Sequence, residues 1–100
     1  MSAVLSYVTD LAGPAGNVTF HRERQWGHGT FRGYRHTIAL EFVGGAKVTA
    51  AEAFIVAFPA HEFDLADVLV AEAAVVHVDR DLRPAPCTLV TICILTLETA

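Results

Sequence analysis

Polar and apolar side chains alternate along two neighbouring stretches of the chain, residues 18–26 and residues 32–42. A two-residue period is typical of a strand that buries one face and exposes the other. The residues between the two stretches are rich in glycine, which favours a turn. The pattern therefore predicts a β-hairpin that turns near Gly29.

A local signal further along the chain predicts a helix. Thr49 is followed three residues later by Glu52, which is the pattern of a capping box at a helix start. The alanine-rich residues that follow favour a helix, and Pro59 stops it, so we expect a helix over about 50–58. Its wall is almost wholly apolar, which is typical of a helix buried on more than one side.

Two apolar stretches after this helix predict two further strands. Residues 69–79 are rich in valine, and residues 88–97 (TLVTICILTL) are uncharged and largely β-branched. A strand that is apolar on both faces belongs in the middle of a sheet or under an interface. The pattern of residues 3–9 fits either a strand or a short helix.

Together these elements predict an α+β fold, a two-layer sandwich with one main helix on a mostly antiparallel sheet of four to five strands in the order (β)ββαββ. The 100 residues make a single domain, 1–100. A sheet with one helix leaves much of its second face bare, and the chain is 53% apolar, above the usual share of about 45–50%. We therefore expect a homodimer with sheet-on-sheet or edge-to-edge packing.

Charge is distributed unevenly along the chain. Residues 21–36 contain four arginines, three aromatic residues and one glutamate, whereas the whole chain has a net charge of −4. A basic, aromatic segment on an acidic chain indicates a local surface for an acidic protein or a small anionic ligand. Nucleic acid is less favoured, because general nucleic-acid binding needs positive charge over a wide face.

Pairing the two hairpin strands symmetrically about residue 29 predicts which of these side chains share a face of the sheet. One sheet face then holds a candidate binding site made of Arg22, Arg24, Trp26, Arg32, Tyr34 and His36. Arginine forks suit carboxylates and phosphates, and aromatic rings offer stacking surfaces. The opposite face holds His21 and an ion pair between Glu23 and Arg35. The alternative interpretation is a solvated hairpin tip whose arginines stack on the aromatic rings for stability.

A small enzyme is the second functional hypothesis. It would act on an acidic metabolite by proton-transfer or lyase chemistry, in a pocket between sheet and helix, with His36 or His77 as the base. The five histidines and two cysteines show no spacing typical of metal ligands, and no nucleophile motif is present. The sequence therefore predicts no cofactor, no metal site and no assigned catalytic residue.

The cysteines, the first residues and the length of the apolar runs indicate the cellular compartment. Cys87 and Cys93 lie six residues apart on one predicted strand, about 20 Å along it, which is beyond the reach of a disulfide. The first residues lack the basic region of a signal peptide, and no apolar run is long enough to span a membrane. We therefore expect reduced thiols and a cytoplasmic protein.

Overall fold

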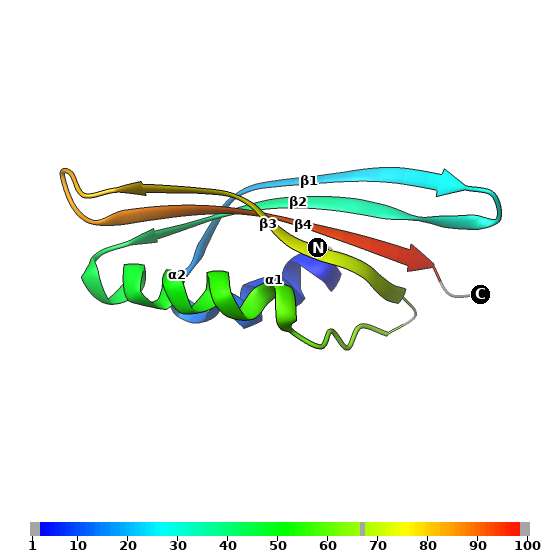
Figure 1. Cartoon of the computed structure of the whole chain (residues 1–100), viewed down its shortest axis with the longest axis horizontal. Coiled ribbons are helices and arrows are strands. Elements are labelled where there is room, and N and C mark those ends of the chain that lie inside the picture. The colour runs from blue at the N-terminus through cyan, green and yellow to red at the C-terminus, as the bar shows by residue number, and fades with distance from the viewer. Residues whose placement is uncertain (1–2, 67, 99–100) are drawn as a thin grey trace.

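Two helices pack on one face of a four-stranded antiparallel sheet (Figure 1). The computed structural model describes residues 3–66 and 68–98. In chain order the elements are α1 (Ala3–Ala12), η1 (Gly13–Ala15), β1 (Asn17–His28), β2 (Phe31–Val43), α2 (Gly45–Ala57), η2 (Phe58–Ala60), β3 (Val68–Asp81) and β4 (Cys87–Glu98). The predicted α+β class is confirmed, and each of the four main predicted strands is present, one or two residues longer at each end.

The strands lie in the order β1-β2-β4-β3, and every neighbouring pair is antiparallel. The uncharged strand β4 lies between β2 and β3, as its two apolar faces predicted. The two hairpins, β1–β2 and β3–β4, are therefore joined side by side through β2 and β4. Their turns lie at opposite ends of the sheet (Figure 1).

Residues 3–12 form a helix, so the optional fifth strand of the predicted order is wrong, and the order of elements is αββαββ. Val4 and Val8 are the buried residues of α1. They lie one helical turn apart and so share one face of a helix, whereas every second residue would be buried in a strand. Seven residues were too few for the sequence pattern to choose between the two periods.

Helix α2 begins five residues earlier than predicted, because Gly44 turns the chain directly out of β2. Its φ of 106° is a conformation that favours glycine. Thr49 therefore lies inside the helix, where its hydroxyl donates to the Gly45 carbonyl at 3.1 Å. Glu52 instead accepts two hydrogen bonds, at 2.8 and 3.1 Å, from Arg80 of β3. The predicted capping box is wrong, and Glu52 ties α2 to the sheet.

The core lies between the sheet and the two helices. Alternate side chains of β2 and β4 point into it and meet apolar residues of α1, α2 and η2: Ile38, Leu40, Phe42, Val90, Ile92 and Ile94 against Val4, Val8, Ala51, Phe54 and Phe58. Helix α2 contacts the sheet on one side and α1 on another. Its outer wall is bare, and Val56 is 77% exposed. The helix was predicted to be buried on more than one side. The sheet and α1 bury two sides of α2, and its outer side is exposed.

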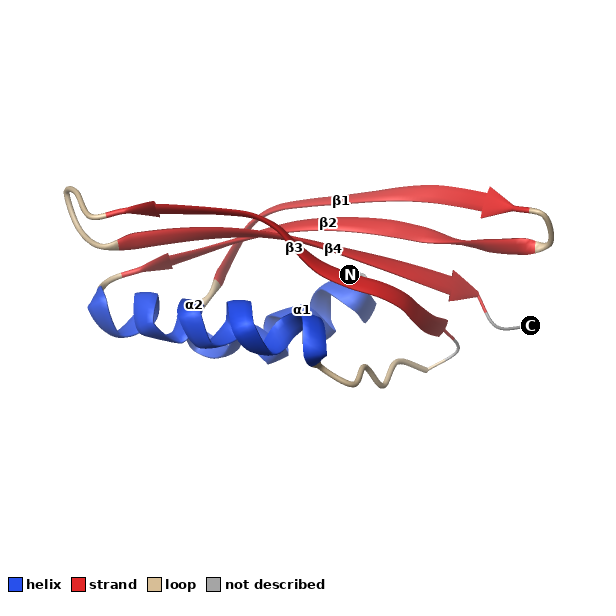
Figure 2. Cartoon of the chain, viewed as in Figure 1, coloured by secondary structure: helices blue, strands red, loops and turns tan. Residues whose placement is uncertain are grey.

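The sheet is longer than the layer that covers it. The molecule measures 49 × 23 × 20 Å. The 13 residues of β2 extend about 43 Å, whereas the 13 residues of α2 extend about 20 Å. The β1–β2 turn end therefore projects beyond the helices, whereas α2 extends beneath the strands at the opposite end of the sheet (Figure 2). No helix of the described chain is long and apolar enough to cross a membrane.

The second face of the sheet is bare: no helix or loop among residues 3–66 and 68–98 packs across it (Figure 2). We call it the open face. It is formed by the residues of β2 and β4 that alternate with the core residues, and by their cross-strand partners on β1 and β3. The side that carries the helices is the helix side.

Candidate functional site

A β-bulge decides which hairpin side chains share a face. The hairpin has the predicted register at Val18, which lies opposite Leu40. The register then shifts by one residue, so that Phe20 lies opposite Ala39. Such a shift moves every later side chain to the other face. The predicted pairing is therefore wrong beyond the bulge.

The shift divides the six predicted site residues between the two faces. Arg22, Arg24 and Trp26 lie on the open face, whereas Arg32, Tyr34 and His36 lie on the strand positions of the helix side. Trp26 and Arg32 still line one hollow near the β1–β2 turn, together with Gln25 and Gly27. The Trp26 indole nitrogen is buried there without a hydrogen-bond partner among the described residues.

Three arginines gather on the open face, and we call Arg22, Arg24 and Arg35 the basic cluster. Arg24 and Arg35 are direct cross-strand partners, and all three side chains are exposed. Like charges directly opposite each other destabilise a sheet. None of the three forms an ion pair with a carboxylate of residues 3–66 and 68–98. Sequence reasoning missed Arg35, because it assigned this residue to Glu23 on the opposite face.

An apolar strip runs along β4 beside the basic cluster. Its outward side chains are half-buried: Leu89, Thr91, Cys93, Leu95 and Leu97. Phe20 is 49% exposed and Leu69 is 57% exposed on the outer strands, β1 and β3. Cys87 and Cys93 are free thiols on this face. An apolar surface bordered by charges is typical of an interaction site.

Three carboxylates lie on the open face at the opposite end from the basic cluster, and we call Glu41, Asp79 and Asp81 the acidic cluster. They line a hollow of about 400 Å³ with Cys87 and Arg83. Burial raises the pKa of the Cys87 thiol, and the three carboxylates raise it further. The Arg83 backbone donates a 3.0 Å hydrogen bond to Asp81, but its guanidinium forms no ion pair with a carboxylate of the described chain.

His36 lies on the helix side and is only 2% exposed. Its Nε2 lies 3.6 Å from a Glu23 carboxylate oxygen, and its Nδ1 lies 3.3 Å from His21 Nε2. The two imidazole rings stack with centroids 5.6 Å apart, so the predicted separation of these histidines is wrong. Burial lowers the pKa of His36, Glu23 raises it, and His21 lowers it.

A cavity of about 310 Å³ lies beside His36, where the first turn of α1 meets the sheet. Its polar lining comes from Glu23, Tyr34, His36 and Thr96. His36 therefore lies at a pocket between sheet and helix, which is where the enzyme hypothesis places the catalytic base. His77 does not, because it is exposed on the open face opposite Thr91.

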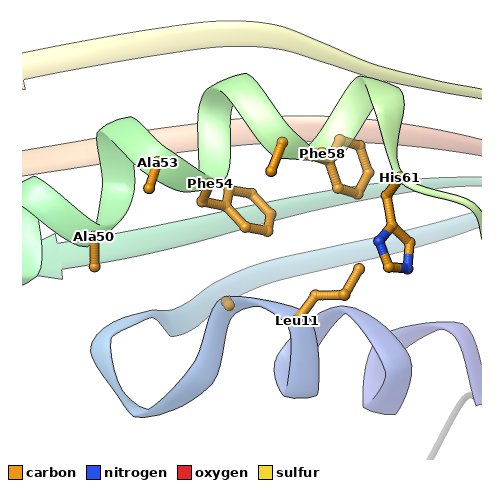
Figure 3. A pocket seen from close by; sticks show the side chains of 8 residues that line it. Leu11, Ala50, Ala53, Phe54, Phe58 and His61 are labelled. Atoms are coloured by element: carbon orange, nitrogen blue, oxygen red, sulfur yellow. The ribbon is translucent and has the colours of Figure 1, made fainter.

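A further hollow, of about 320 Å³, lies between α1 and α2 and has mainly apolar walls (Figure 3). Leu11 projects into it from α1, and Phe54 and Phe58 face it from the other side. His61 lies at one end, where its Nε2 is 2.8 Å from the Tyr7 hydroxyl. No arginine or lysine lines this cleft, so it offers nothing to hold an anion.

Comparisons with known proteins found no match. A scan against models of protein families, a search of curated protein sequences and a search of solved structures all gave this result. Within residues 3–66 and 68–98, no group of three histidine, cysteine or acidic side chains is arranged to hold a metal ion. The function is therefore inferred from the geometry of the site.

Proposed function

We propose that the protein is a binding module whose open face engages an acidic protein surface through the basic cluster. The observation that carries this proposal is the cross-strand pair of Arg24 and Arg35, two exposed like charges that form no ion pair with any carboxylate among the described residues. Carboxylates of a partner would remove the repulsion and form charge-assisted hydrogen bonds with the guanidinium groups.

The surroundings of the cluster favour a protein over a small anion. Its three arginines lie on a bare sheet face beside an apolar strip, and Trp26 lies on the same face. Arginine and aromatic residues are enriched at protein interfaces. Small ligands bind instead in enclosed pockets that bury most of their surface.

The proposed site is narrower than the one predicted from sequence. Arg22, Arg24 and Trp26 remain in it, and Arg35 joins them. Arg32, Tyr34 and His36 lie at helix-side positions and are not needed for the contact. Nucleic acid stays less favoured, because the same face also carries the acidic cluster and the chain has a net charge of −4.

A titration of fluorescently labelled polyglutamate, followed by anisotropy, tests this proposal. We expect the wild-type chain to bind at low salt, and Arg24→Glu/Arg35→Glu to bind at least about tenfold more weakly. The matched control is Arg32→Glu/Lys47→Glu, which changes the net charge equally but leaves the three arginines of the basic cluster intact. Equal weakening by the control would show a net-charge effect and contradict the proposed site.

Two competitors separate the alternative ligands in the same assay. Inorganic phosphate that displaces polyglutamate at low concentration would indicate a small-anion site. Stronger binding of a single-stranded oligonucleotide than of polyglutamate would indicate nucleic acid. Failure of the wild-type chain to bind any of these probes, at a concentration low enough to keep it monomeric, would contradict an anion-binding role for the basic cluster.

The cavity beside His36 supports a second candidate function, a small enzyme of the proton-transfer or lyase type. His36 is buried with a lowered pKa, so its imidazole is neutral at pH 7 and able to accept a proton. Glu23 lies close enough to orient the ring and to stabilise the imidazolium that would form. The sequence predicts a small acidic metabolite as the substrate, but the described residues that line this cavity include Glu23 and no arginine or lysine, so an uncharged substrate fits it better.

Deuterium exchange tests this second candidate without a known substrate. A panel of small carboxylic acids and uncharged carbonyl compounds is incubated with the protein in D₂O, and loss of C–H signals is followed by NMR. Exchange that is catalysed by the wild-type chain and by His28→Gln, but not by His36→Gln, would support the enzyme. Absence of catalysed exchange over the whole panel would leave the binding module as the proposed function.

A further inference from the structure

The open face carries clusters of opposite charge at opposite ends. The basic cluster lies toward the β1–β2 turn, and the acidic cluster lies toward the β3–β4 turn. Arg35 and Glu41 are six residues apart on β2, which is about 20 Å. Charges this far apart are largely screened at physiological salt, where the Debye length is about 8 Å. Within one chain, therefore, neither cluster neutralises the other.

We infer that the acidic surface bound by the basic cluster is the acidic cluster of a second copy of this chain, so that two open faces pack together. This inference rests on the proposed function, since it names the partner of the same site. A two-fold axis between the sheets, near Ala39 and Thr91, brings each basic cluster over the acidic cluster of the other copy. The contact is self-complementary, and each charge attraction occurs twice.

The open face has the area that a stable dimer needs. Four strands about 4.8 Å apart and about 40 Å long cover roughly 750 Å². A standard interface buries about 800 Å² on each partner. Ala39 and Thr91 pair with each other at the centre of this face. Both side chains are small, so the sheets can approach to the usual packing distance of about 10 Å.

The uncharged part of the face supplies the apolar contact. The strip along β4 occupies the middle of the sheet, with Phe20 and Leu69 exposed on the outer strands. An uncharged strand with a bare apolar face is also an aggregation hazard. A second copy would cover this strip and place opposite charges at both ends. Arg83 makes the acidic end less negative but does not make it positive, since three carboxylates line the same hollow.

Glu72 adds a further carboxylate at the basic end. It lies on β3 in the row of the sheet that also holds Arg24, Arg35 and Leu95. Within the described residues it forms no ion pair with either arginine. Glu72 therefore makes the basic end less positive but does not reverse its charge, since Arg22, Arg24 and Arg35 lie at the same end of the open face.

Two charge-reversed variants of the full chain test the inference by sedimentation velocity. The acid-faced variant is Arg24→Glu/Arg35→Glu, and the base-faced variant is Asp79→Arg/Asp81→Arg. Each should self-associate at least about tenfold more weakly than the wild type, because like charges then face each other. An equimolar mixture of the two should restore the dimer. The matched controls, Arg32→Glu/Lys47→Glu and Asp10→Arg/Glu62→Arg, should behave as the wild type.

The outcomes that overturn the inference are equally specific. They are a wild-type chain that stays monomeric at low salt, variants that self-associate as well as the wild type, and a mixture that fails to associate. The wild-type dimer should also weaken as salt rises, and this measurement needs no variant. A dimer that is insensitive to salt and to both reversals would use another surface.

The base-faced variant separates this inference from the proposed function, since its basic cluster is intact. If it binds polyglutamate while the mixture fails to associate, the self-association is wrong and the binding module stands. If it fails both to bind polyglutamate and to associate with the acid-faced variant, both proposals are wrong. Circular dichroism of each variant establishes that these exposed substitutions leave the chain folded.

Discussion

Arg24 of β1 lies directly opposite Arg35 of β2, on a sheet face that no helix of residues 3–66 and 68–98 covers. The pair costs stability in the isolated chain, because like charges opposite each other repel. Because no carboxylate in the described part of the chain pairs with either arginine, both guanidinium groups are available to a partner. The repulsion between the two arginines lowers the stability of the chain, and the proposed binding of acidic groups to the open face would relieve it.

This relationship predicts that binding and stability change in opposite directions. Arg35→Glu places a negative charge opposite Arg24 and should raise the free energy of unfolding by about 0.2–1 kcal/mol. The same substitution should weaken polyglutamate binding. Thermal unfolding of dilute protein at low salt measures the first effect, and Arg32→Glu is the control. A loss of stability in Arg35→Glu would mean that the guanidinium is structural.

Buried His36 predicts a loss of stability in mildly acidic solution. Its folded pKa is lowered by burial, whereas the unfolded pKa is about 6.5. Below about pH 6.5 the unfolded chain therefore binds a proton that the folded chain resists, and the free energy of unfolding falls as the pH falls. His36→Gln should reduce this dependence between about pH 7.5 and pH 5.5. An unchanged dependence in His36→Gln, or an equal reduction in His28→Gln, would contradict this account.

The acidic cluster predicts slow alkylation of Cys87. Burial and the neighbouring carboxylates raise the pKa of this thiol, so less of the reactive thiolate is present near neutral pH. In a Cys93→Ser background, Asp79→Asn/Asp81→Asn should lower that pKa and increase the rate of reaction with iodoacetamide. Glu72→Gln, farther along the same strand, is the control. An unchanged rate in the double variant would show that Asp79 and Asp81 do not raise the pKa of the thiol.

Gly33 occupies a position where the structure leaves no room for a side chain. A Cβ atom there would collide with the Thr96 backbone carbonyl of the neighbouring strand. Gly33→Ala should therefore push β2 and β4 apart and lower the free energy of unfolding by about 1–3 kcal/mol. At Gly45 a Cβ meets nothing within 4 Å, so Gly45→Ala should leave stability unchanged or raise it. Equal effects in the two variants, measured by urea unfolding, would contradict the close approach.

Much of the fold could be predicted from the sequence, because the strands have strong local patterns. Alternation marked β2, and the uncharged run marked β4 as an interior strand. The helix was found but its start was not, since Gly44 and the residues after it carry no sequence signal as clear as Thr49 followed by Glu52. Residues 3–9 stayed ambiguous because so short a segment satisfies both periods.

The candidate site was harder to predict, because it depends on a single extra residue. The bulge between Val18 and Phe20 moves Arg22 to the face of Arg35 and away from that of His36. No residue type in this stretch demands a bulge. The acidic cluster was also missed, because it is assembled by the strand order and by two further irregularities in β3. These depend on contacts between distant parts of the chain.

NMR mapping with polyglutamate on ¹⁵N-labelled protein tests the central claim most directly, because it identifies the face that binds. Trp26 is the single tryptophan, so its indole signal reports on the open face without ambiguity. We predict saturable shifts at the Trp26 indole and at the amides around Arg24 and Arg35, with α2 unaffected. Shifts confined to the cleft between α1 and α2, or to the surroundings of His36, would contradict the assignment of binding to the open face.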